Sequence, residues 1–280
     1  PNLVLDAACS SSLVALALGA LALDRGEVDV AIVGGASYAQ TNSLILFSQA
    51  QSCSATGSRP FDAKADGLVG SEGYVAMVLK TEEQARRDGD SILAVIRGIG
   101  LSTDGRGRHL WAPRKEGQTA AMQRAYGSAI DPAGVQYVEA HATSTQVGDA
   151  TEIESMAEFF GHHLNGAKVP IGSVKSNVGH TLETAGLASL LKVILAMKHE
   201  AIPPTINIDK LNDGIAWNTI PFEVARSLRP WARPDGDVRR AGVSAFGIGG
   251  LNVHLIVEEA GDAPSSSVQQ AAPSREPIAI

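Results

Sequence analysis

The sequence predicts an α/β fold in which helices cover sheets built from short strands. Two observations support this prediction. Short apolar runs rich in branched residues recur along the chain and are typical of buried strands, at residues 30–33, 74–79, 93–96, 135–138 and 255–257. Longer stretches of good helix formers lie between them, at residues 115–128, 149–160 and 184–197.

The first helix is expected earlier in the chain. Residues 13–23 are apolar or Gly at every position, which predicts a helix buried on all sides, and Arg25-Gly26 predicts its end. Residues 1–6 resemble a buried strand that begins without a polar leader. We therefore expect an upstream part of the domain to be absent from this sequence.

The composition changes near the end of the chain. After Glu259 the sequence is rich in Ala, Pro, Ser and Gln and contains too few apolar residues to form a core, so residues 261–275 are interpreted as a flexible linker. Residues 276–280 regain strand character and are interpreted as the possible start of a following domain. The main domain is expected to occupy residues 1–260.

Composition and charge exclude several classes of protein. The 280 residues are 44% hydrophobic, enough for one large core or two modest ones. A net charge of −7 argues against binding to nucleic acid or to an anionic membrane surface, since both require a basic face.

The location is expected to be cytoplasmic. Residues 1–6 lack the features of a signal peptide, and the apolar run at 13–23 is too short to span a bilayer. Two cysteines do not make a disulfide framework, and Cys53 lies in a polar stretch, so a reducing compartment is favoured.

Cys9 lies between the strand-like start and the first turn of the apolar helix. A helix N-terminus presents unpaired N–H groups and the positive end of the helix dipole, which favour a thiolate and lower the pKa of a cysteine. The position thus predicts a nucleophile. The alternative is a small buried hydrophobe beside the helix, because free cysteines are commonly buried.

Two histidines occupy loops that follow predicted strands, where α/β proteins place their chemistry. His141 is followed by the hydroxyl residues Thr143 and Thr145, and His180 ends a segment, 172–180, predicted to be a short strand and a glycine-bordered turn carrying Lys175. Two such histidines together with a cysteine at a helix start indicate catalysis. The remaining histidines are interpreted as structural or surface residues: His109, His162, His163, His199 and His254.

Residues 246–252 form the glycine-rich segment FGIGGLN before the last strand. A dinucleotide-binding loop follows a strand and opens a helix, so this segment does not fit that class. Two interpretations stay open: a tight turn, or a loop whose backbone N–H groups approach a substrate closely, as in an oxyanion hole.

These blocks, in this order, resemble the β-ketoacyl synthase family of the thiolase superfamily, from residue 1 to about Glu259. The matching blocks are DAACSSSL around Cys9, SRPFD at 58–62, DGLVGSEG at 66–73, STDGRGRHLWAP at 102–113, EAHATST at 139–145, GSVKSNVGH at 172–180, PPTIN at 203–207 and FGIGGLN at 246–252. The resemblance implies a thiolase-like layered αβαβα fold with an incomplete first half and a complete second half, since family members carry a sizeable segment before the cysteine motif.

The resemblance implies a decarboxylative Claisen condensation. Cys9 would accept an acyl group from an acyl carrier protein, and His141 and His180 would bind the thioester carbonyl of a malonyl-type extender and stabilise the enolate formed when carbon dioxide leaves. The enolate carbon would then attack the acyl group on Cys9.

The resemblance also assigns supporting roles. The backbone N–H groups of Cys9 and Ile248 would form the oxyanion hole, and the loop around Ile248, with Gly247 and Gly249, would gate access. Lys175 would order the histidines, with Asp149 or Glu152 as its ionic partner, and Thr143 and Thr145 are further supporting residues. Ala142 and Leu251 depart from the family pattern, which usually has Gly and Thr there.

The expected partners are an acyl carrier protein and a second ketosynthase-like domain, in a homodimer or pseudo-dimer. No cofactor or metal is expected in this domain, because substrates arrive as phosphopantetheine thioesters. One alternative is a non-elongating partner that shapes the product tunnel or binds acyl chains. Another is a thiolase-like enzyme that uses coenzyme A thioesters, which the arrangement of two histidines with Lys175 fits less well.

Overall fold

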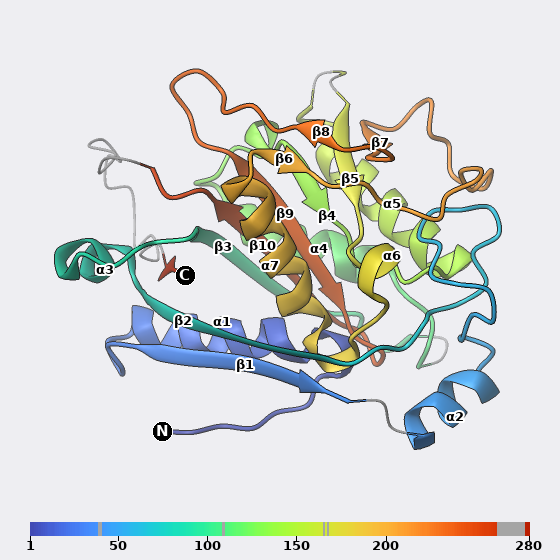
Figure 1. The fold of residues 1–280 in the computed structure, drawn as a ribbon, viewed down its shortest axis with the longest axis horizontal. Coiled ribbons are helices and arrows are strands. Elements are labelled where there is room, and N and C mark those ends of the chain that lie inside the picture. The colour runs from blue at the N-terminus through green and yellow to red at the C-terminus, as the bar shows by residue number, and fades with distance from the viewer. Residues whose placement is uncertain (39–40, 108–109, 165, 167, 262–277) are drawn as a thin grey trace.

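The computed structural model describes residues 1–38, 41–107, 110–164, 166, 168–261 and 278–280, and its main feature is one mixed β-sheet (Figure 1). The order of strands in this sheet is β1-β2-β11-β3-β10-β9-β4-β5-β7. Their bounds are β1 Ala31–Ser37, β2 Gly73–Thr81, β3 Val95–Thr103, β4 Tyr137–Glu139, β5 Val169–Gly172, β7 Phe222–Val224, β9 Arg240–Phe246, β10 Leu251–Glu258 and β11 Ile278–Ala279. A separate pair is formed by β6 (Ala201–Ile202) and β8 (Arg229–Pro230).

Helices cover both faces of the sheet. Helices α1 (Ser11–Asp24) and α7 (Ala185–Lys198) pack on one face, and α4 (Lys115–Tyr126) and α5 (Gln146–Phe160) pack on the other. Strand β10 shows why: Val253 and Leu255 join the core beneath α1 and α7, whereas Ile256 joins the core beneath α4 and α5. The shorter helices are α2 (Thr41–Gln49), α3 (Glu82–Asp88) and α6 (Lys175–Val178), with 3₁₀ turns η1 (Ala8–Ser10), η2 (Pro132–Gly134) and η3 (Leu182–Thr184).

The parallel part of the sheet places two loops side by side. Strands β4 and β5 run parallel with Glu139 opposite Gly172, so both chains leave the sheet at the same edge. The loop after β4 carries His141, and the segment after β5 carries α6 and His180. The carboxyl ends of parallel strands are where open α/β sheets bind ligands, and this edge therefore positions the candidate site.

The predicted α/β fold is confirmed, and each apolar run and each helical stretch predicted after residue 12 corresponds to an observed strand or helix. Three details were wrong. Residues 1–7 form no strand, and the side chains of Leu3 and Val4 are exposed rather than buried. Helix α1 is not buried on all sides, because Leu18 is 41% exposed. The predicted turn after β5 contains one turn of helix, α6.

One face of the β1–β2 pair is apolar and exposed. The register sets Ile32 opposite Val78 and Ala36 opposite Tyr74, and the three large side chains Ile32, Tyr74 and Val78 are 77%, 67% and 56% exposed. The opposite face of the same strands, with Val33 and Met77, is buried against the core. These two strands therefore carry apolar residues on both faces, a pattern typical of strands buried between two layers.

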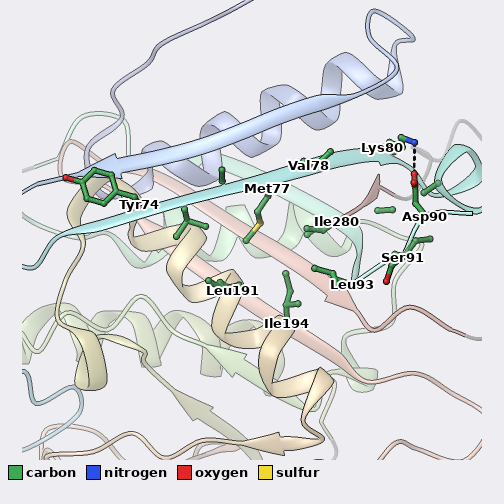
Figure 2. A pocket seen from close by; sticks show the side chains of 15 residues that line it. Tyr74, Met77, Val78, Lys80, Asp90, Ser91, Leu93, Leu191, Ile194 and Ile280 are labelled. Atoms are coloured by element: carbon green, nitrogen blue, oxygen red, sulfur yellow. Dashed lines mark hydrogen bonds and ion pairs between the residues drawn. The ribbon is translucent and has the colours of Figure 1, made fainter. Parts of the chain in front are cut away.

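The predicted linker lies outside the described residues except for Gly261, as do residues 276 and 277. Residues 278–280 do have strand character: β11 lies between β2 and β3 and pairs antiparallel with both. A cavity of about 610 Å³ lies beside β11. Figure 2 shows Met77, Leu191, Leu93 and Ile280 around it, with the Lys80–Asp90 ion pair at its edge.

None of the helices in the described parts of the chain has the length and apolarity that a bilayer span needs.

Candidate active site

Cys9 lies in η1, immediately before α1, and is buried. The turn that presents it is unusual, since Ala8 has φ +51°, in the left-handed region that side chains with a Cβ seldom adopt. Hydrogen bonds from Ser10 Oγ to Ala7 O and from Ser11 Oγ to Ala8 O hold this turn in place. Such backbone outliers gather at functional sites, where the surrounding structure enforces them.

The thiol of Cys9 is less acidic than its place at a helix start predicts. Burial raises its pKa to about 11, and this effect outweighs the positive charge of Lys175 and the backbone N–H groups of Ile248 and Cys9, which lower the pKa. The predicted lowering of the Cys9 pKa was therefore wrong in its net direction. Loss of solvation dominates because the side chain is enclosed, a property that depends on packing rather than on the local sequence.

His141 and His180 come together with Cys9. One side-chain atom from each of the three residues lies within 4.8 Å of the others, and the two imidazole rings meet edge to face with their centroids 5.6 Å apart. Phe246 contacts the His141 ring from the end of β9, with the ring centroids 5.7 Å apart. The prediction that two loops bring these histidines to the cysteine is confirmed as geometry.

Both histidines are uncharged. Burial lowers the pKa of each well below its usual value, and the positive charge of Lys175 lowers both further. The Nδ1 atom of His180 accepts a hydrogen bond from the backbone N–H of Leu182 at 3.0 Å. Because a neutral imidazole carries one proton, His180 must carry it on Nε2, which is buried without a hydrogen-bond partner among the described residues.

The same tautomer argues against a metal centre. One cysteine and two histidines are typical zinc ligands, and their grouping here makes the question necessary. A histidine ligates through an unprotonated nitrogen, yet the lone pair on Nδ1 of His180 is already used and its Nε2 bears the proton. His180 therefore fits the role of a hydrogen-bond donor better than that of a metal ligand.

Lys175 does not form the expected ion pair. Its Nζ atom is buried without a hydrogen-bond partner in the described part of the chain. Glu152 instead accepts hydrogen bonds from the backbone N–H groups of His141 and Ala142, at 2.7 Å each, and Asp149 Oδ2 accepts one from Phe61 N at 2.8 Å. The expectation of a direct salt bridge was wrong: both oxygens of Glu152 accept from backbone donors, and Oδ1 of Asp149 is buried without a hydrogen-bond partner among the described residues.

The charges around Lys175 act on it without contact. Burial lowers the pKa of Lys175, and Glu139, Glu152, the Cys9 side chain and Asp149 oppose that change, in this order of strength. Burial has the opposite effect on the two neighbouring acids: it raises the pKa of Asp149 and of Glu152, each to about 7. Glu152 still holds His141 in place, because its carboxylate accepts the hydrogen bond from the backbone N–H of His141.

The glycine-rich segment forms a tight turn between β9 and β10. The backbone N–H of Gly247 donates to Leu251 O at 2.8 Å, and that of Gly249 donates to Leu110 O at 3.3 Å. At Gly247 a Cβ atom would lie 2.6 Å from Ala7 O, so only glycine allows this close approach to the turn before Cys9. The backbone N–H of Ile248 in the same turn is one of the groups that lower the pKa of the Cys9 thiol.

A cavity of about 540 Å³ is lined by Cys9, His141, His180 and Ile248. Its wall near the solvent includes Thr143 and Thr145, whose hydroxyl groups are 3.1 Å apart. Its apolar wall was not predicted from the sequence and is formed by Phe47, Leu68 and Trp111. Leu68 and Trp111 lie in two of the matching sequence blocks, but nothing local shows that the fold brings them together with Phe47.

Comparisons with known proteins show the family of this chain. Residues 1–85 match the β-ketoacyl synthase N-terminal domain, and residues 93–209 match the β-ketoacyl synthase C-terminal domain. The chain is 41% identical over 268 residues to a polyunsaturated fatty acid synthase polypeptide of a Thraustochytrium species, covering 92% of this chain and 10% of that protein. It is 42% identical over 264 residues to the polyketide synthase ThaG of Burkholderia thailandensis, covering 92% of this chain and 5% of that protein.

Solved structures give the same result. The ketosynthase from module 6 of the bacillaene synthase of Bacillus subtilis 168 matches with a TM-score of 0.89 and 39% identity, covering 92% of this chain and 48% of that one. The oxazolomycin ketosynthase domain OzmH KS7 of Streptomyces albus matches with a TM-score of 0.90 and 36% identity, covering 95% and 49%. The chain thus spans about half the length of these ketosynthases and has their thiolase-like fold. It belongs to the β-ketoacyl synthase family.

Proposed function

We propose that this chain carries the catalytic centre of an elongating β-ketoacyl synthase, which joins an acyl group on Cys9 to a malonyl-type extender held on an acyl carrier protein. One observation carries the proposal: Cys9 and two uncharged imidazoles, from separate loops, meet within 4.8 Å in one cavity. Each group fits a defined step of that reaction.

In the first step, the sulfur of Cys9 attacks the thioester carbonyl of the incoming acyl group. The new carbon–sulfur bond replaces the bond to the phosphopantetheine sulfur, which leaves as a thiol and takes up the proton that Cys9 gives up. With a pKa of about 11, Cys9 is a thiol at neutral pH and must lose its proton during the attack. The unprotonated ring nitrogen of neutral His141 can accept it.

In the second step, the extender loses carbon dioxide. The electrons of the breaking carbon–carbon bond move into an enolate, whose negative charge lies on the thioester oxygen. The Nε2–H of His180 is a donor with no other partner in the described residues and can bind that oxygen. Donors aimed at charge that develops in the transition state accelerate such a step.

In the third step, the enolate carbon attacks the acyl carbonyl on Cys9, and the carbon–sulfur bond breaks to give a β-ketoacyl product on the carrier protein. The sulfur of Cys9 leaves with the electron pair of that bond and takes up a proton from water, which restores the thiol. The carbonyl oxygen becomes negatively charged in between. The backbone N–H groups of Cys9 and Ile248 both lower the pKa of the Cys9 thiol, so they favour negative charge at this place and are suited to act as the oxyanion hole for the carbonyl oxygen. The turn at Gly247 and Gly249 holds Ile248 there.

The presence of Cys9, His141 and His180 together favours an elongating enzyme over a purely structural partner domain. The test uses the full-length protein that carries this sequence, with acyl-loaded and malonyl-loaded carrier protein. Mass spectrometry is expected to detect an acyl adduct on Cys9 and a β-ketoacyl product. An adduct without extension would leave only a gatekeeping role, and the absence of any adduct on Cys9 would exclude the enzyme.

A further inference from the structure

A second group of buried charges lies behind the catalytic side chains. Glu139, the last residue of β4, has no exposed surface, and its Oε2 lies 2.7 Å from Nζ of Lys192 on α7. The hydroxyl of Tyr137 donates to the same Oε2 at 2.6 Å and accepts from Lys192 Nζ at 2.9 Å. We call these three residues the Glu139 network.

The Glu139 network connects the segments that carry the catalytic residues. Oε1 of Glu139 accepts a hydrogen bond from the backbone N–H of Val174, at 2.5 Å, and Val174 directly precedes Lys175. Glu139 itself lies two residues before His141, and Lys192 lies on the helix that follows His180. One carboxylate therefore links β4, the start of α6 and α7.

The packing around the network leaves little freedom. A Cβ atom at Gly172 would lie 2.6 Å from the Tyr137 hydroxyl and 2.7 Å from Thr205 Oγ1, so the end of β5 lies directly against the network. The backbone N–H of Ala140 donates to Gly172 O at 2.8 Å. A shift of the Glu139 carboxylate would move both catalytic loops together.

Glu139 also acts on Lys175 through its charge. Lys175 has no hydrogen-bond partner in the described residues, and among the charges that favour its protonated form Glu139 is the strongest. The ion pair with Lys192 offsets part of the cost of burying Glu139 and keeps the carboxylate at this position. Apolar residues could fill the same space, so packing alone does not require these charges.

We propose that Glu139 is a positioning residue of the ketosynthase, which holds Lys175 and the loop of His141 through its contacts with Val174 and Lys192. This inference rests on the proposed function, because the residues it positions act in that reaction. It assigns to the Glu139 network a larger role in decarboxylation and condensation, which use both histidines, than in the transfer of the acyl group to Cys9, which uses His141 but not His180.

The test compares Glu139→Gln, Lys192→Met and the double variant in the full-length protein. Each single change leaves one buried charge unpaired and is expected to lower the melting temperature, whereas the double change removes both charges and is expected to restore it. The double variant is expected to lose less of its rate of Cys9 acylation than of its rate of condensation. Its turnover number for condensation should fall by about tenfold or more, with the Michaelis constant for the malonyl carrier little changed.

The matched control is Glu259→Gln. Glu259 forms a largely buried ion pair with Arg239 at the opposite end of β9 and β10 from the glycine-rich turn. This change should lower the melting temperature without altering the ratio of condensation to acylation. A network that serves only stability would behave like this control.

Each outcome decides the matter. Full recovery of condensation in the double variant, or an equal loss of acylation and condensation, would overturn the proposal. If the double variant does not fold, Glu139→Asp takes its place: it keeps the charge but shortens the side chain, and the same selective loss of condensation is expected. Failure of the unaltered protein to condense would instead refute the proposed function, and the same assay shows this before any variant is measured.

Discussion

The backbone N–H of Leu182 donates a hydrogen bond to Nδ1 of His180 at 3.0 Å, and this single contact determines what the histidine can do. A main-chain N–H can only donate, so Nδ1 must be the acceptor and the proton lies on Nε2. Leu182 reaches this position with φ +44°, a conformation that the chain adopts only under constraint. The structure thereby presents His180 as a fixed donor.

His180 is expected to be needed for decarboxylation and not for acyl transfer. His180→Ala removes the Nε2–H donor, so the variant should still form the acyl adduct on Cys9, while release of carbon dioxide from the malonyl carrier should fall by about a hundredfold or more. The two half-reactions are followed by mass spectrometry and by labelled carbon dioxide. His254→Gln serves as control, because His254 is buried beside Ser244 and does not line the cavity; a similar loss in that variant would contradict the assignment.

The reactivity of Cys9 is expected to rise steeply with pH. A thiol with a pKa of about 11 is almost fully protonated at neutral pH, so its alkylation by iodoacetamide should increase by about tenfold for each pH unit from 7 to 9. Lys175 lowers the pKa of Cys9, so Lys175→Met should raise that pKa and slow alkylation at every pH in this range. A plateau in the alkylation rate below pH 9 would show that the thiolate is already formed.

The fold and the three candidate catalytic side chains could be predicted from the sequence because local patterns indicate both. Apolar runs mark the strands, and Cys9, His141 and His180 each lie at a point where a regular element begins or ends. The net pKa of Cys9 could not be predicted in this way. It depends on burial, which is decided by segments far away in the chain, such as the turn at Gly247 that packs against Ala7 and Ser10.

The surroundings of Lys175 were missed for the same reason. The family resemblance suggested Asp149 or Glu152 as its ionic partner, but backbone N–H groups occupy both oxygens of Glu152 and one oxygen of Asp149. The sequence does contain a signal for the Glu139 network. Lys192 is the single charged residue in the long apolar run of α7 before its last residue, and such a charge needs a buried partner.

Gly247 is expected to tolerate no side chain. A Cβ atom there would lie 2.6 Å from Ala7 O and 2.8 Å from Ser10 Oγ, so Gly247→Ala must push the turn that carries Ile248 away from Cys9. The free energy of unfolding should fall by about 1–3 kcal/mol, and acylation of Cys9 should slow. Gly34→Ala is the control, since its nearest contact would be an ordinary 3.5 Å to Val75 O. Normal acylation in Gly247→Ala would show that the turn does not contribute to the oxyanion hole.

The exposed face of β1 and β2 leads to a prediction about residues 1–280 produced alone. Ile32, Tyr74 and Val78 are all more than half exposed on adjacent strands, and the chain spans about half the length of the solved ketosynthases it matches. An apolar sheet face left in water favours association between copies, so we expect this polypeptide to elute as aggregates in size-exclusion chromatography.

Replacing Ile32 and Val78 by Thr should reduce the aggregated fraction, because both strands keep a residue with good strand propensity while the face becomes more polar. Replacing Val33 by Thr on the buried face of the same strand should instead lower stability and increase aggregation. A monodisperse peak with a sharp cooperative melt for the unaltered residues 1–280 would show that this face is stable in water and needs no covering layer.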